Sequence, residues 1–106
     1  MEQVVVVALL KLNEGAAEEA IEGFRPVIEK THLEKGCRAY ALHQDRSDSD
    51  TIVLVEKWDS QADLDAHFVQ PHMADMGELA SKLLAEPPRI LFCESIEIGD
   101  PAKGLI

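Results

Sequence analysis

The chain has 106 residues, 46% of them hydrophobic, which suits one domain with a single core and leaves no room for a second. Its 20 Asp and Glu outnumber 10 Lys and Arg, and the formal net charge of −10 repels phosphate backbones and anionic lipids, so we expect no nucleic acid or membrane partner. The apolar run Val4–Leu10 is too short to span a bilayer and lacks a signal peptide's basic flank, which predicts a cytoplasmic protein.

The first half of the chain predicts a strand, a helix and a hairpin. A β-branched apolar run from Gln3 to Leu12 is typical of a central strand covered on both faces. From Ala17 to Thr31, apolar residues recur at helical spacing with glutamates on the opposite side. Cys37–Asp45 and Thr51–Trp58 then predict two strands joined by a polar turn.

The second half predicts a broken helical region and a last strand. Ser60–Asp63 has the pattern of a capping box, and its helix should run to about Val69, where Pro71 stops it. A second helix follows and ends before two prolines. Arg89–Ile98 predicts the last strand, so we expect one domain over 1–106 with its core at about 3–98 and an irregular tail at 99–106.

The order β-α-β-β-α-β predicts an α+β, ferredoxin-like fold, with a four-stranded antiparallel sheet and its helices on one face. The expected strand order 4-1-3-2 places Cys37 and Cys93 on opposite edges, too far apart for a disulfide. The first and last strands carry apolar residues on both sides, and a bare apolar sheet face is unusual on a monomer. We therefore expect a homodimer joined through the sheets.

Several short motifs carry a family resemblance: Glu34-Lys35-Gly36-Cys37, Tyr40 with Leu42, Glu56-Lys57-Trp58, Ala66-His67 and Pro71-His72. In their order and spacing, from about Val4 to Phe92, the chain resembles the antibiotic biosynthesis monooxygenase family. The resemblance implies a dimeric α/β barrel with a pocket between sheet and helices in each protomer. Such relatives include oxygenases that act on phenols or quinols without metal or flavin, an isomerase-like enzyme that acts on a sugar phosphate signal, and haem degraders.

His67 is the first candidate for catalysis. It shares a predicted helix face with Leu64 and Phe68, so its imidazole should point toward the sheet. A free imidazole titrates near 6.5 and is the natural proton acceptor at neutral pH. The alternative is a core histidine that is hydrogen-bonded to the backbone or to Glu56 and only supports the fold.

Glu56 and His72 complete the catalytic candidates. Glu56 lies on a central strand among apolar neighbours, so if buried it needs a partner, either His67 or Arg38 or Lys57 at a dimer seam. His72 begins the next helix and should lie at the pocket mouth. It follows His67 by five residues with a proline between, whereas ligands on one helix face need a spacing of three or four. We predict no metal site.

Further side chains are candidates for contact with a small-molecule substrate: Tyr40, Trp58, Phe68, Met73 and Met76. A buried Tyr40 hydroxyl needs a hydrogen-bond partner, which a substrate oxygen can provide. Flexible methionine thioethers suit a pocket for flat apolar ligands. The alternative for Trp58 and both methionines is an ordinary place in the core.

The function that we predict is a monooxygenase, independent of any cofactor, which acts on a small aromatic phenol or quinol with His67 as base. Deprotonation makes such a substrate electron-rich enough to reduce dioxygen itself. The alternatives are a cofactor-free isomerase of a small carbonyl compound or sugar phosphate signal, a haem-binding or haem-degrading protein, and a non-catalytic dimer that binds a small ligand. The haem alternative lacks the expected asparagine in the first strand, and His67 stands where those relatives have tryptophan.

Overall fold

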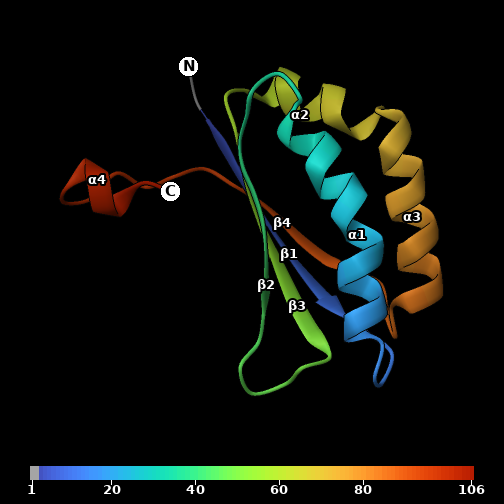
Figure 1. The fold of residues 1–106 in the computed structure, drawn as a ribbon. Helices are drawn as coiled ribbons and strands as arrows, with labels where there is room; N and C mark the ends of the chain where they lie inside the picture. Colours follow the sequence, from blue (N-terminus) through green and yellow to red (C-terminus); the bar gives the residue numbers. More distant parts are fainter. Residues whose placement is uncertain (1–2) are drawn as a thin grey trace.

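The computed structural model describes residues 3–106. Its strands form one sheet in the order β2-β3-β1-β4, and each neighbouring pair is antiparallel, as predicted (Figure 1). The strands are β1 (Val4–Lys11), β2 (Cys37–Gln44), β3 (Thr51–Trp58) and β4 (Arg89–Cys93). Cys37 and Cys93 thus lie on opposite edge strands, and both are free thiols.

The three longer helices cover one face of this sheet (Figure 1). The helices are α1 (Ala17–His32), α2 (Gln61–Phe68), α3 (Pro71–Leu83) and α4 (Pro101–Gly104). The Ser60 hydroxyl accepts the Asp63 backbone N–H at 3.1 Å and caps α2 as predicted. Pro71 is the first residue of α3, so the helical region breaks where the sequence indicates. Within residues 3–106, every helix is too short or too polar to cross a membrane.

The space between sheet and helices holds two packed clusters. The apolar cluster lies where β1 ends and consists of Leu10, Leu12, Ala20, Phe24, Ile52 and Leu83. The mixed cluster lies where β1 begins and consists of Val6, Ala8, Tyr40, Leu54, Trp58 and Leu64, together with the buried polar residues Glu56 and His67. Buried polar groups therefore gather at one end of the molecule.

The other face of the sheet carries apolar side chains and has no helix over it in residues 3–106 (Figure 1). On β1, Val5, Val7 and Leu9 alternate with the residues that face the helices. They pair with neighbours on β3, where Val7 lies opposite Val55 and Leu9 opposite Val53. The homodimer stays a prediction, and this face is the surface that it needs.

The last strand is shorter than predicted. It ends at Cys93, not at Ile98, because Cys93 pairs with Val5 and β1 begins only one residue earlier. Beyond this point the tail leads away from the sheet (Figure 1), and Ile96 and Ile98 are 76% and 75% exposed. The tail also contains the short helix α4, where we expected irregular structure.

Candidate functional site

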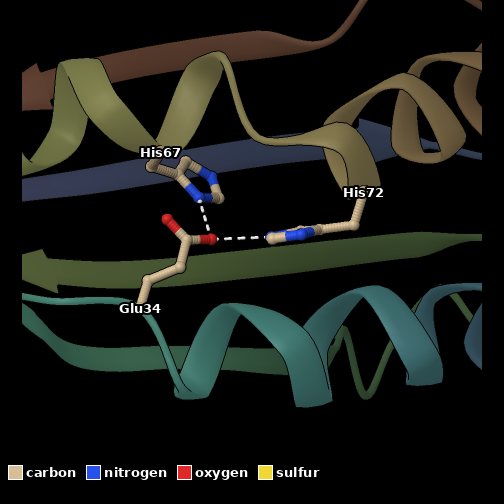
Figure 2. A group of neighbouring side chains, drawn as sticks. All are labelled: Glu34, His67 and His72. Carbon is tan, nitrogen blue, oxygen red and sulfur yellow. Dashed lines mark hydrogen bonds and ion pairs between the residues drawn. The ribbon is translucent and has the colours of Figure 1, made fainter.

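The side chains of Glu34, His67 and His72 converge on one point between the helices (Figure 2). One oxygen of Glu34, Oε2, lies 2.9 Å from His67 Nδ1 and 2.6 Å from His72 Nε2. His67 is 1% exposed and His72 is 8% exposed, so both bonds are shielded from water. We call these residues the Glu–His–His cluster.

The turn between α1 and β2 holds Glu34 in place. Its backbone N–H donates to the Thr31 carbonyl at 3.0 Å, and its own carbonyl accepts from the Cys37 N–H at 3.3 Å. Gly36 has a φ of 81°, and a Cβ there would meet the Asp63 carboxylate of α2, so this turn requires glycine. The Gly36 carbonyl accepts from Asp59 N–H at 2.8 Å, which ties the turn to the segment before α2.

The break between α2 and α3 brings the two histidines together. His67 lies in the last turn of α2 and His72 in the first turn of α3. The spacing argument considered only ligands on one helix face, and it fails as an argument against a joint site because the chain changes direction at Gln70 and Pro71 and brings two helix ends together. Glu34 comes from a third segment, which no local spacing in the sequence connects to either histidine.

His67 is enclosed by aromatic rings. Its ring centroid lies 4.7 Å from that of Trp58, 5.4 Å from Tyr40 and 5.5 Å from Phe68. A carboxylate oxygen only accepts, so Nδ1 carries the proton in the bond to Glu34. The neutral ring then has its lone pair at Nε2, which is buried without a hydrogen-bond partner in residues 3–106. The cluster therefore presents an oriented basic nitrogen to a largely apolar environment.

Glu56 does not orient His67, and that expectation is wrong. Its carboxylate accepts the indole N–H of Trp58 at 2.9 Å. The predicted alternatives through Arg38 or Lys57 are not seen within this chain either, because the Arg38 guanidinium binds Asp59 at 2.6 Å and Lys57 lies on the opposite face of β3. Burial raises the pKa of Glu56 to about 7, against a smaller opposing effect of the Trp58 hydrogen bond. Sequence reasoning missed Glu34, although it begins the first family motif.

Tyr40 stays a neutral phenol over the ordinary pH range. It is 3% exposed and packs edge-on against Trp58. Burial raises its pKa far above the usual value, and the nearby charges of Glu56 and Glu34 raise it further. Its hydroxyl therefore serves as a hydrogen-bond group and not as a base.

The remaining predicted contact residues are spread around the mixed cluster. Trp58 is fully buried and donates its indole N–H to Glu56, as a core residue would. Phe68 is less buried than its helix face suggested, at 45% exposure, and packs edge-on against Phe92, which is 59% exposed. Met76 packs against both clusters, and Met73 is half-buried on α3.

Two cavities approach the site from different sides. The first, of about 570 Å³, lies between α1 and β2, and Ile28, Tyr40 and Leu42 are in its mostly apolar wall. Tyr40 belongs to both this wall and the rings around His67. The second, of about 620 Å³, is lined by Glu34 and His72 themselves. Cavities of this size hold small organic ligands.

Comparisons with known proteins show which family and fold this chain resembles. The family model described as "Antibiotic biosynthesis monooxygenase" matches residues 3–79, a span that contains the whole Glu–His–His cluster. An uncharacterized protein of Synechocystis, sll1783, is 31% identical over 87 residues, which cover 82% of this chain and 59% of that protein. In Escherichia coli, the protein named "Probable quinol monooxygenase YgiN" is 30% identical over 69 residues, 58% of this chain and 66% of its own length.

These alignments span less than two thirds of each curated relative. A solved structure covers more of the fold. The crystal structure of PA3566 from Pseudomonas aeruginosa superposes with a TM-score of 0.83 and 26% identity, over 92% of this chain and 97% of that one.

Proposed function

Since the chain belongs to the antibiotic biosynthesis monooxygenase family, we propose that it is a cofactor-independent monooxygenase of small phenols or quinols with His67 as general base. The observation that carries the proposal is the buried His67 ring, whose Nδ1–H is held by Glu34 and whose Nε2 has no partner in residues 3–106. The E. coli relative named as a quinol monooxygenase supports the choice of substrate class.

The proposed reaction needs little from the protein beyond a base and a dry site. Nε2 of His67 takes the hydroxyl proton of the substrate, and the resulting anion supplies the electrons that dioxygen requires. One oxygen atom enters the ring as a carbonyl, and the other leaves as water with two substrate hydrogens. The Glu34 carboxylate stabilises the imidazolium that forms, because the charges lie close together in a shielded place.

We place the substrate ring in the cavity between α1 and β2. Its apolar wall suits a flat aromatic compound. His67 does not line this cavity, but Tyr40 does and its ring centroid lies 5.4 Å from that of His67, so the substrate hydroxyl has to reach Nε2 past Tyr40. The neutral Tyr40 hydroxyl can donate a hydrogen bond to a substrate oxygen. Phe68 packs against both His67 and Phe92 and adds apolar surface beside the base.

A second copy of the chain completes this proposal by covering the open face of the sheet. The half-buried valines of β1 and β3 on that face offer the apolar surface that a stable dimer buries. Light scattering should return a dimer mass at micromolar concentration, and Val55→Glu at the centre of the face should shift it toward monomer. The matched change Glu29→Lys on the helix side should leave the mass unchanged. A wild-type monomer would contradict the dimer.

Oxygen uptake with a panel of hydroquinones tests the activity. We expect consumption by the wild type that persists with a chelator, and a loss of roughly 10²-fold or more in His67→Gln, which removes the base. Glutamine keeps an N–H donor for Glu34, and equal melting temperatures would show that the fold is intact. Turnover of a carbonyl substrate without oxygen uptake would contradict the proposal and favour the isomerase alternative.

A further inference from the structure

We propose that the Glu–His–His cluster is also a reversible site for a divalent transition ion of the zinc class, and that the ion switches off His67 as a base. The site itself follows from the geometry alone. The switch rests on the proposed function, because it requires His67 to be the base.

The three side chains have the donor types and the placement that such an ion requires. One ligand atom from each of Glu34, His67 and His72 lies within 4.8 Å of the others. Two imidazoles and one carboxylate are a common protein ligand set for zinc, with a fourth position left open. Ligand atoms around tetrahedral zinc stand about 3.3 Å apart. To admit the ion, the distances from Glu34 Oε2 to His72 Nε2 (2.6 Å) and His67 Nδ1 (2.9 Å) would lengthen by less than 1 Å, and the two histidine nitrogens, within 4.8 Å of each other, would move closer together.

The site has an entry path. The cavity of about 620 Å³ is lined by Glu34 and His72, so an ion in this cavity meets two of the three ligands. Lys30 and Lys35 also line this cavity, and their positive charges disfavour cations. The negative charge of Asp63 in the same wall partly offsets that repulsion. The formal net charge of −10 attracts cations to the molecule as a whole.

The surroundings of His67 explain why the ion should be exchangeable. An ion at Nδ1 displaces the proton to Nε2, and a metal-bound histidine normally donates this second N–H to an acceptor. In residues 3–106, Nε2 of His67 has none, and a buried donor without a partner weakens binding. The same proton on Nε2 removes the lone pair with which His67 would accept the substrate proton.

Binding to the purified protein tests the site without reference to activity. Calorimetry with Zn²⁺ should show one ion per chain, and Co²⁺ should give the visible absorption bands of a low-coordinate site. Glu34→Gln and His72→Gln should each weaken binding at least tenfold, because the loss of a mere hydrogen-bond partner of a ligand already costs roughly 10- to 100-fold in affinity. His43→Ala is the matched control, because His43 is exposed on β2 and lies outside the cluster, and its affinity should equal the wild type.

Absence of stoichiometric binding to the wild type would overturn the site, as would equal weakening by His43→Ala. Because the wild type is measured first, a variant that does not fold still leaves the test decisive. The switch is tested separately, by adding Zn²⁺ to an oxygen-uptake assay and then removing it with a chelator. Inhibition that reverses is expected. Tight binding with unchanged uptake would overturn the switch, and binding to a protein that consumes no oxygen would overturn the proposed function but leave the site.

Discussion

At the end of the sheet where β1 finishes, Leu12 and Phe24 pack among other apolar side chains, whereas the end where β1 begins encloses Glu56 and His67. Residues of α1 and α3 pack against both ends, and α2 adds Leu64 to the mixed cluster only. Burying a carboxyl or an imidazole costs free energy that a methyl group does not. The apolar cluster shows that half of this core closes without such groups, and their concentration at the other end supports our proposal that the site lies there.

Phe24→Ala should show the largest effect, and it should act on stability alone. Phe24 is 1% exposed in the apolar cluster, and its removal leaves a cavity that should lower the free energy of unfolding by about 3–5 kcal/mol. Urea titration measures this change. At low temperature, where the variant stays folded, oxygen uptake should match the wild type. A large loss of turnover in the folded variant would mean that the apolar cluster also contributes to activity and not to stability alone.

Glu56→Gln should change how stability depends on pH. The folded protein keeps a proton on Glu56 up to about pH 7, whereas a free glutamate loses it near 4.5. This group therefore favours folding at low pH, and its contribution is lost as the pH rises from about 4.5 to 7. Glutamine keeps an oxygen for the Trp58 N–H but does not titrate.

We expect the loss of unfolding free energy between pH 5 and pH 8 to be smaller in Glu56→Gln than in the wild type by roughly 2–3 kcal/mol. Urea titrations of both proteins at the two pH values measure it. An equal loss of unfolding free energy in the two proteins would show that Glu56 is ionised in the folded state throughout this range.

Glu34→Gln should lower kcat by roughly 10- to 100-fold, less than the loss of His67 itself, because it removes a charge that only the imidazolium state needs. The amide oxygen can still accept the His67 N–H, so KM should change little. Steady-state oxygen uptake separates the two constants. A rise of KM with unchanged kcat would instead assign Glu34 to substrate binding.

The sequence predicted the elements well because their signals are local. The apolar spacing of α1, the Ser60 cap and the break at Pro71 each depend on residues within a few positions, and the structure confirms them. The strand order followed from handedness and connection rules. The overlong last strand arose from the apolar alternation through Ile98, which continues past the end of its partner β1.

The site was predicted in part, for a physical reason. His67 was identified from its helix face, but its partner lies 33 residues away in a turn. Glu56 was chosen because it shares one face of β3 with apolar residues and Trp58, which the structure confirms, yet Trp58 itself takes its hydrogen bond. Periodicity predicts which face a residue occupies, and it does not predict which of several polar groups on that side will meet.

We expect the smallest loss of stability from alanine substitution of two glycines, one at each end of the molecule. Gly36 and Gly15 have φ values of 81° and 77°, so alanine at either position should cost about 1–2 kcal/mol of unfolding free energy. They differ in their surroundings, since a Cβ at Gly15 meets nothing within 4 Å, whereas at Gly36 it meets the Asp63 carboxylate. Gly36→Ala must therefore also shift the turn that carries Glu34, and Gly15→Ala is its matched control. Urea titration should show the larger loss in Gly36→Ala, and oxygen uptake should fall in that variant only. Equal turnover in both would mean that Glu34 reaches His67 without the exact fit of this turn against α2.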